Sequence, residues 1–208
     1  MQTFLTIEFR KELAKIVSEI ELSSEVEIVV GIKPMSSFYY ELYLVSGILT
    51  SFLVFTFFMF YDHVFGDYLI YMGTIFSFFF GITLGFILKD VFKFFIPKKM
   101  LQRNVEIMAR ALFQKGGIHH TKEKVGVFIL FSIFEKKHFI VADRKAQNSI
   151  PFEEWKKINS NFEKVFKHKE SSKILTEELL KTKDLFSKFL PPIENDINEL
   201  ADDLEINL

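Results

Sequence analysis

The chain has 208 residues, a net charge of −1 and no cysteine, although 25% of its residues are charged. The absence of cysteine excludes disulfide bonds, thiolate nucleophiles and the zinc or iron–sulfur sites that use cysteine ligands. A net charge near zero favours no polyanionic partner, so a nucleic acid is not expected. The mean hydropathy of +0.20, beside so many charges, indicates that apolar and charged residues lie in separate parts of the chain.

The first forty residues predict a helix followed by a strand. Thr6 stands where a helix cap is expected, ahead of five apolar residues at helical spacing. Residues 26–32 then alternate Val and Ile, which is typical of a strand, and Lys33-Pro34 ends it. The apolar face of the predicted helix consists of Phe9, Leu13, Ile16, Val17 and Ile20.

Two uncharged apolar stretches follow, residues 42–61 and 68–88, separated by a very short connection. Each would form a helix about 30 Å long, which matches the hydrocarbon thickness of a bilayer. A helix satisfies its own backbone hydrogen bonds and is therefore stable in lipid. A buried hairpin in a soluble core is the alternative, but such helices should show some polar face. The sequence therefore predicts a transmembrane hairpin over residues 41–88.

The charges beside the two stretches predict an orientation. The connection carries Asp62 and Asp67 but no Lys or Arg, whereas five basic residues follow the second stretch. Because basic loops tend to stay on the cytoplasmic side, we expect both chain ends in the cytoplasm and two spans in the inner (cell) membrane. The expected partner is the lipid bilayer. The basic residues are Lys89, Lys93, Lys98, Lys99 and Arg103.

Small residues recur at every fourth position of the second stretch, which leaves a smooth face for close helix packing. One interpretation is that this face packs on the first stretch, which carries Ser46, Gly47, Thr50 and Ser51. The other is a homodimer, or a second membrane protein, bound through the same face. The small residues are Gly73, Ser77, Gly81 and Gly85.

The residues after the hairpin predict a helix, two strands and two further helices. Gly116-Gly117 ends the first of these helices, which carries Leu101, Val105, Met108 and Leu112. Residues 125–134 read as a central strand, residues 135–137 as a tight connection, and residues 138–142 as a second strand. The last two helices carry apolar residues at helical spacing, and Pro191-Pro192 stops the second. They are Phe152, Trp155, Ile158, Phe162 and Val165, then Leu175, Leu179, Phe186 and Phe189.

This order of elements predicts the fold class α/β, with a small mixed sheet flanked by helices on its faces and interrupted by the membrane hairpin. We expect one domain built from residues 1–40 and 89–208. The hairpin is then an insertion into a loop of that domain, and the chain ends in an acidic tail. Trp155 is expected in the core.

The segment Ala111-Leu-Phe-Gln-Lys-Gly-Gly-Ile-His-His-Thr121, followed by Lys124-Val-Gly-Val-Phe-Ile-Leu130, resembles the signature of TPM domains. Asp143, Trp155, Phe189-Leu-Pro191 and Asn198-Glu199-Leu200 resemble further family positions in the same order. The chain departs from the family pattern at three places. Ala142 replaces a glycine, Ala201 replaces a proline, and Lys124 replaces an arginine.

The resemblance implies a TPM-like fold, and several bacterial TPM proteins are similar in carrying a membrane hairpin at this place. Divalent-metal binding and phosphatase or nucleotidase activity are proposed for some members, so the resemblance also implies these functions as alternatives. The sequence shows no catalytic constellation, so we expect a membrane-anchored cytoplasmic module that binds or scaffolds. A weak divalent-metal-dependent phosphatase or nucleotidase is the alternative.

The hypothesis of a metal site places it where Asp143 ends a strand, since ligands gather at that edge in α/β domains. The resemblance implies that the tail residues Asn198 and Glu199 form the second polar element of this candidate metal site. Carboxylate and amide oxygens suit Ca²⁺ or Mg²⁺, so Asp143, Asn198 and Glu199 are the candidate ligands. The competing interpretation is that Asp143 only caps a turn and Glu199 is solvated.

Overall fold

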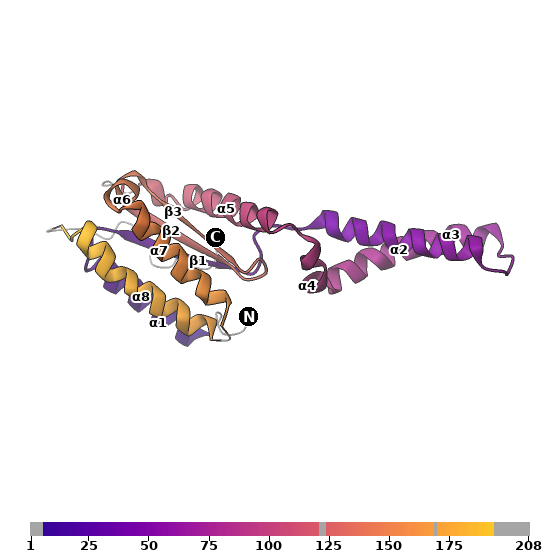
Figure 1. Ribbon diagram of the computed structural model, residues 1–208, viewed down its shortest axis with the longest axis horizontal. Helices are drawn as coiled ribbons and strands as arrows, with labels where there is room; N and C mark the ends of the chain where they lie inside the picture. The colour runs from indigo at the N-terminus through magenta and orange to yellow at the C-terminus, as the bar shows by residue number, and fades with distance from the viewer. Residues whose placement is uncertain (1–5, 121–123, 169, 194–208) are drawn as a thin grey trace. The chain divides into compact units, whose positions relative to one another are not determined.

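The structure, a computed structural model, describes residues 6–120, 124–168 and 170–193 (Figure 1). The chain forms two compact units. One, called the domain below, combines Met1–Ser37 with Lys99–Leu208. The other, called the hairpin unit, is Phe38–Lys98, so it interrupts the domain in sequence.

The domain contains a three-stranded mixed sheet in the order β1-β2-β3. Its strands are β1 (Glu27–Lys33), β2 (Gly126–Ser132) and β3 (Lys137–Ala142). β1 and β2 are parallel, with Val30 opposite Ile129, and β2 and β3 are antiparallel, with Ile129 opposite Ile140. A parallel pair needs a long connection, and here it holds the whole hairpin unit and helix α5 (Lys98–Lys115). The predicted α/β class with a small mixed sheet is confirmed.

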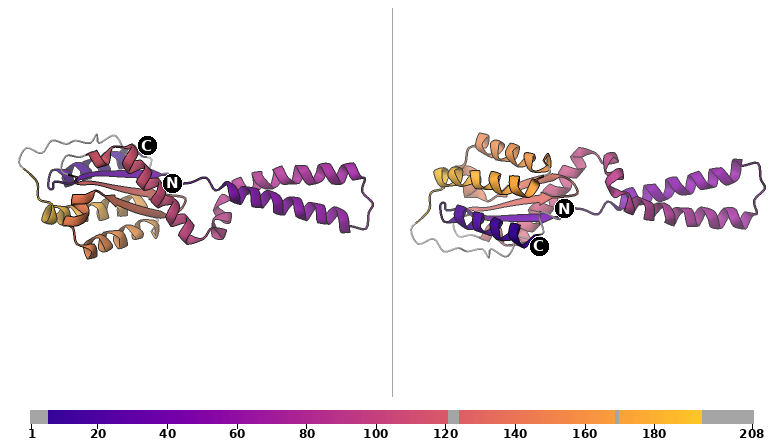
Figure 2. Two further views of the ribbon diagram at one scale, coloured as in Figure 1. Left: turned by 90° about the horizontal axis from the view of Figure 1, so that it is seen from above. Right: turned by 90° about the horizontal axis from the view of Figure 1, so that it is seen from below.

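One face of the sheet is covered by α1 (Ile7–Glu21), α6 (Arg144–Ser149), α7 (Phe152–Phe162) and α8 (Ser171–Phe189), as Figure 2 shows. The buried residues of α1 are the five that the sequence predicts. The predicted cap is confirmed, because the Phe9 backbone N–H donates to Thr6 Oγ1 at 3.3 Å.

Helix α5 covers the opposite face of the sheet (Figure 2). It ends before Gly117, whose φ of 68° lies in the left-handed region that favours glycine. Two short 3₁₀ helices complete the described domain, η3 (Ile118–His120) and η4 (Glu163–Phe166). The core on this face combines strand residues Val29, Phe128 and Leu130 with Val105, Ala109, Leu112 and Phe113 of α5.

Three details of the domain differ from the sequence prediction. The short helix α6 was not predicted, since its six residues contain no apolar repeat. Phe152 is 76% exposed although it fits the helical spacing, because it lies in the first turn of α7. Trp155 is only half-buried, although it packs against the core, with its ring centroid 6.2 Å from that of Phe186.

The turn between β2 and β3 is anchored by the buried carboxylate of Glu135. Its Oε1 accepts from the Ser36 backbone N–H at 3.0 Å and from Ser36 Oγ at 2.7 Å. Its Oε2 accepts from the Ser132 hydroxyl. One carboxylate therefore joins the segment after β1 to the β2–β3 turn and holds that turn in place.

The hairpin unit contains two long helices, α2 (Tyr40–Phe60) and α3 (Asp67–Ile87), then α4 (Lys89–Phe92) and the 3₁₀ helix η2 (Lys93–Phe95). The helix bounds lie within about two residues of the predicted stretches, the usual uncertainty at helix ends. The acidic residues of the two long helices, Glu41 and Asp67, lie in their first turns. A two-helix apolar hairpin inserted in the fold is therefore confirmed.

Helices α2 and α3 pack through their small residues. Ser46 Oγ donates to the Gly81 carbonyl at 2.8 Å, and Ser51 Oγ donates to the Thr74 carbonyl at 3.1 Å. A Cβ at Gly81 would lie 2.6 Å from Thr50 Oγ1, so only glycine permits this approach. The face with Gly73, Ser77, Gly81 and Gly85 thus contacts α2 of the same chain. A homodimer through that face stays a prediction, and it would require α2 to move away.

Candidate functional site

Asp143 lies directly after β3, at the strand end where a ligand site was predicted. Its Oδ1 accepts from the Arg144 backbone N–H at 2.7 Å, so the residue caps α6. Its Oδ2 is buried and has no hydrogen-bond partner among the described residues. Asp143 thus caps α6 through one carboxylate oxygen, while the other is buried.

The other two predicted ligands, Asn198 and Glu199, lie outside the described residues, so their distance from Asp143 stays a prediction. Within the described ranges, no group of three or more His, Asp or Glu side chains is placed to hold a metal ion. Calcium takes six to eight oxygen ligands, and Asp143 supplies a single carboxylate. The described residues thus do not complete a Ca²⁺ or Mg²⁺ site, and the metal-dependent phosphatase remains a prediction from the sequence.

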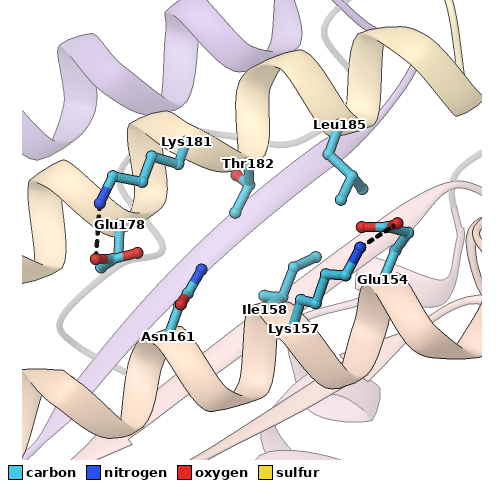
Figure 3. Close-up of a pocket in the computed structure, with 8 residues that line it drawn as sticks. All are labelled: Glu154, Lys157, Ile158, Asn161, Glu178, Lys181, Thr182 and Leu185. Atoms are coloured by element: carbon cyan, nitrogen blue, oxygen red, sulfur yellow. Dashed lines mark hydrogen bonds and ion pairs between the residues drawn. The ribbon is translucent and has the colours of Figure 1, made fainter.

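A small groove lies between α7 and α8, with a volume of about 140 Å³ (Figure 3). Each wall carries an internal ion pair. Lys157 Nζ donates to Glu154 Oε1 at 2.8 Å on α7, and Lys181 Nζ donates to Glu178 Oε1 at 2.8 Å on α8. The bond to Glu178 raises the pKa of Lys181. Since the charges of this groove compensate one another, it offers no excess charge to a ligand.

A larger groove, called the basic groove below, lies beside the β2–β3 turn and has a volume of about 470 Å³. Its lining comes from three separate stretches of the chain, namely α5, the turn with β3, and the end of α7 with η4. The uncharged polar residues in it are Gln102, His138 and Asn159. Its charged residues are Lys136, Lys137, Glu163 and Lys167.

His138 forms the buried part of the basic groove. Its Nε2 lies 3.3 Å from Asn159 Oδ1, and its backbone carbonyl accepts from Gln102 Nε2 at 3.3 Å. Burial lowers the pKa of His138 from 6.5 to about 4, while the bond to Asn159 and the charge of Glu163 act in the opposite direction. The imidazole is therefore neutral at pH 7.

Fold stability should depend on pH through His138. In the unfolded chain it binds a proton below about pH 6.5, whereas in the folded domain it does so only near pH 4. Between these values the unfolded state holds more protons, so stability falls as the pH is lowered and levels off below about 4. The shift corresponds to a loss on the order of 3 kcal/mol. Urea unfolding between pH 7 and 4.5 should show it.

The matched variant is His138→Gln, which carries no titrating group at this position. Carboxylates also titrate below pH 5, so the two proteins are compared by how steeply their free energy of unfolding changes with pH. In the variant, the free energy of unfolding should change much less between pH 6.5 and pH 5. Superimposable pH profiles would show that His138 is not held neutral by the fold.

The surface of the hairpin unit is apolar over most of its length. Helices Tyr40–Phe60 and Asp67–Ile87 have mean hydropathies of 2.0 and 1.8 over their most apolar windows, of which only 11% and 17% is buried. Both helices are thus long and apolar enough to cross a membrane. A core helix of a soluble protein passes the same hydropathy test, but most of such a helix is buried.

The sequence pattern does not predict the basic groove. It indicates only a tight connection at Lys136-Lys137 and the start of a strand at His138. Two adjacent lysines at a strand turn were the available signal. Gln102 and Asn159 gave none, since they come from helices far apart in sequence and only the folded domain brings them to His138.

No family model matches this sequence, and a search of curated proteins finds no match either. A solved structure is similar: the NMR structure of BA42 protein from the psychrophilic bacterium Bizionia argentinensis. The alignment covers 98% of this chain and 96% of that one, with 16% identity and a TM-score of 0.61. At this level of identity the likeness establishes the fold alone. The chain therefore has a BA42-like α/β fold that carries an apolar helical hairpin.

Proposed function

We propose that this chain is an integral membrane protein in which the α2–α3 hairpin anchors a cytoplasmic TPM-like domain that binds or scaffolds other molecules. The fold shared with BA42 is, in this proposal, the TPM fold. The TPM-like segment over residues 111–130 supports it, because this segment forms the end of α5 and most of the central strand β2.

The exposed apolar surface of the hairpin unit carries the membrane part of the proposal. Large apolar side chains are exposed along both helices, among them Leu53 at 67%, Phe76 at 71% and Phe80 at 63%. In water such a surface is costly, at about 25 cal/mol per Å² of apolar area. In a bilayer the same surface contacts lipid tails, and the helices need no further backbone partners.

The charges around α2 and α3 support the proposed orientation. The loop between the helices carries Asp62 and no Lys or Arg, whereas Lys89 and Lys93 follow α3 directly. These lysines favour the cytoplasmic side and contact with anionic headgroups. Since β1 and β2 pair within one sheet, the segments before and after the hairpin belong on the same side of the membrane.

Cysteine labelling in intact cells tests this topology, and because the chain has no cysteine of its own, only the introduced thiol can react in it. Val64→Cys places a thiol in the interhelix loop at a residue that is 92% exposed. Lys173→Cys places one at an exposed position near the start of α8. An impermeant maleimide added outside should label the first variant and not the second.

After lysis both variants should react, which controls for buried or damaged thiols. If the Lys173→Cys variant is labelled outside intact cells while Val64→Cys is protected, the orientation is reversed. Labelling of both from outside would place the domain and the loop on one side, and α2–α3 would not be a transmembrane hairpin.

A further inference from the structure

Two lysines of the basic groove have no acidic partner within the described part of the domain. Lys167 lies 3.6 Å from Glu163, so that pair is compensated. Lys136 and Lys137 take part in none of the ion pairs among the described residues. Three lysines and one glutamate thus line the groove, and it carries an excess of two positive charges when His138 is neutral.

The backbone that carries these lysines is held in one conformation. Lys136 has a φ of 52°, in the left-handed region, and its N–H donates to the Ile133 carbonyl at 3.3 Å. The Glu135 carboxylate beside it is buried and anchored to Ser36 and Ser132. Two consecutive ammonium groups are therefore presented from a fixed turn, which lowers the ordering cost of binding an anion.

The buried end of the groove adds polar atoms that can orient a ligand. Asn159 Nδ2 donates to the Trp155 carbonyl at 3.1 Å, so its Oδ1 is the acceptor that faces His138. His138 then donates through Nε2–H, and its Nδ1 carries a lone pair. Gln102 uses one amide N–H on the His138 carbonyl and has a second one to donate.

We propose that the basic groove binds a phosphate-type oxyanion, with Lys136 and Lys137 as its principal ligands. Lysine is a common phosphate binder that acts as a point charge, and two such charges match a dianion. A volume of about 470 Å³ leaves room for more than the phosphate group itself, so an ester fits the groove. The same phosphate chemistry is available from a lipid headgroup or from a soluble phosphate compound. This binding site does not depend on the membrane anchor.

The test uses the full chain in micelles of an uncharged detergent, with inorganic phosphate as the probe. NMR signals of the His138 ring report on the groove directly. A bound anion favours the imidazolium form, so phosphate should move these signals and raise the pKa of His138 above about 4. Lys136, Lys137, Glu163 and Lys167 are the charged groups that face this ring or its groove.

The decisive variant is Lys136→Asn with Lys137→Gln, since asparagine tolerates a positive φ. It should weaken phosphate binding about tenfold or more, which is at least about 1.4 kcal/mol. The matched control is Lys156→Gln with Lys157→Gln. It removes two consecutive lysines of α7 that do not line the basic groove. The single variant Lys137→Gln leaves the turn unchanged and should show a smaller loss.

A second arm distinguishes the two sources of the phosphate group. Micelles doped with phosphatidic acid, whose headgroup is a phosphate monoester, should shift the His138 signals and block inorganic phosphate if a headgroup occupies the groove. If they do neither while free phosphate still binds, the source is soluble. The proposal is overturned if neither probe moves the His138 signals, or if the groove variant and the control variant respond alike.

Discussion

Removing the hairpin unit should leave a soluble, cooperatively folding domain. In this variant a Gly/Ser linker of about ten residues joins Ser37 to Lys99. The two core clusters of the domain contain no residue from the hairpin unit, so both should persist. Replacing a long insertion by a flexible loop changes the closure entropy little. Gel filtration without detergent and urea unfolding followed by circular dichroism measure the result.

The matched control carries Val30→Asp in the same linker variant. Val30 is fully buried in β1 and lies opposite Ile129, so an unpaired carboxylate there should abolish folding. An aggregated or unfolded linker variant with no cooperative transition would contradict the separation of the chain into two units. The segments next to the hairpin would then be necessary for the domain to fold.

Phe131→Ala should destabilise the domain by about 3–5 kcal/mol, because it opens a cavity at the centre of the core. The side chain is fully buried in β2. Its ring meets that of Phe162 edge-on at 5.4 Å and lies 6.1 Å from that of Phe166. This ring connects the sheet to α7 and η4, so its removal weakens both contacts. Urea unfolding should therefore show a much lower midpoint.

Phe152→Ala is the matched control, since it makes the same chemical change at a residue that is 76% exposed. It should alter the free energy of unfolding by no more than about 0.5 kcal/mol. Similar losses for the two variants would mean that the first turn of α7 is buried after all. A negligible loss for Phe131→Ala would contradict the position of the core.

Much of the fold could be predicted from the sequence where a pattern is local. The helical spacing behind Thr6 predicted the buried face of α1, and the uncharged stretches predicted α2 and α3. Spacing alone could not show that Phe152 is exposed, since the first turn of a helix can lie beyond the elements that cover the rest of that helix. The six residues of α6 were too short and too polar for any periodicity to show.

The candidate site was less accessible from the sequence. The position of Asp143 at the end of a strand was predicted correctly, because the apolar β-rich run of β3 stops in the sequence directly before it. The basic groove was not predicted, because Gln102, His138 and Asn159 meet only through the packing of α5 and α7 around β3. Contacts between side chains of distant segments depend on how the helices pack on the sheet, which no local sequence pattern shows.

The most direct test of the proposed membrane anchor is alkaline carbonate extraction of membranes from cells that produce the full chain. Peripheral proteins held by charge are released by this wash, whereas a hairpin in the hydrocarbon core is retained. We expect the full chain in the membrane pellet, released only by detergent, and the linker variant in the supernatant. Release of the full chain by carbonate alone would contradict an inserted α2–α3 hairpin.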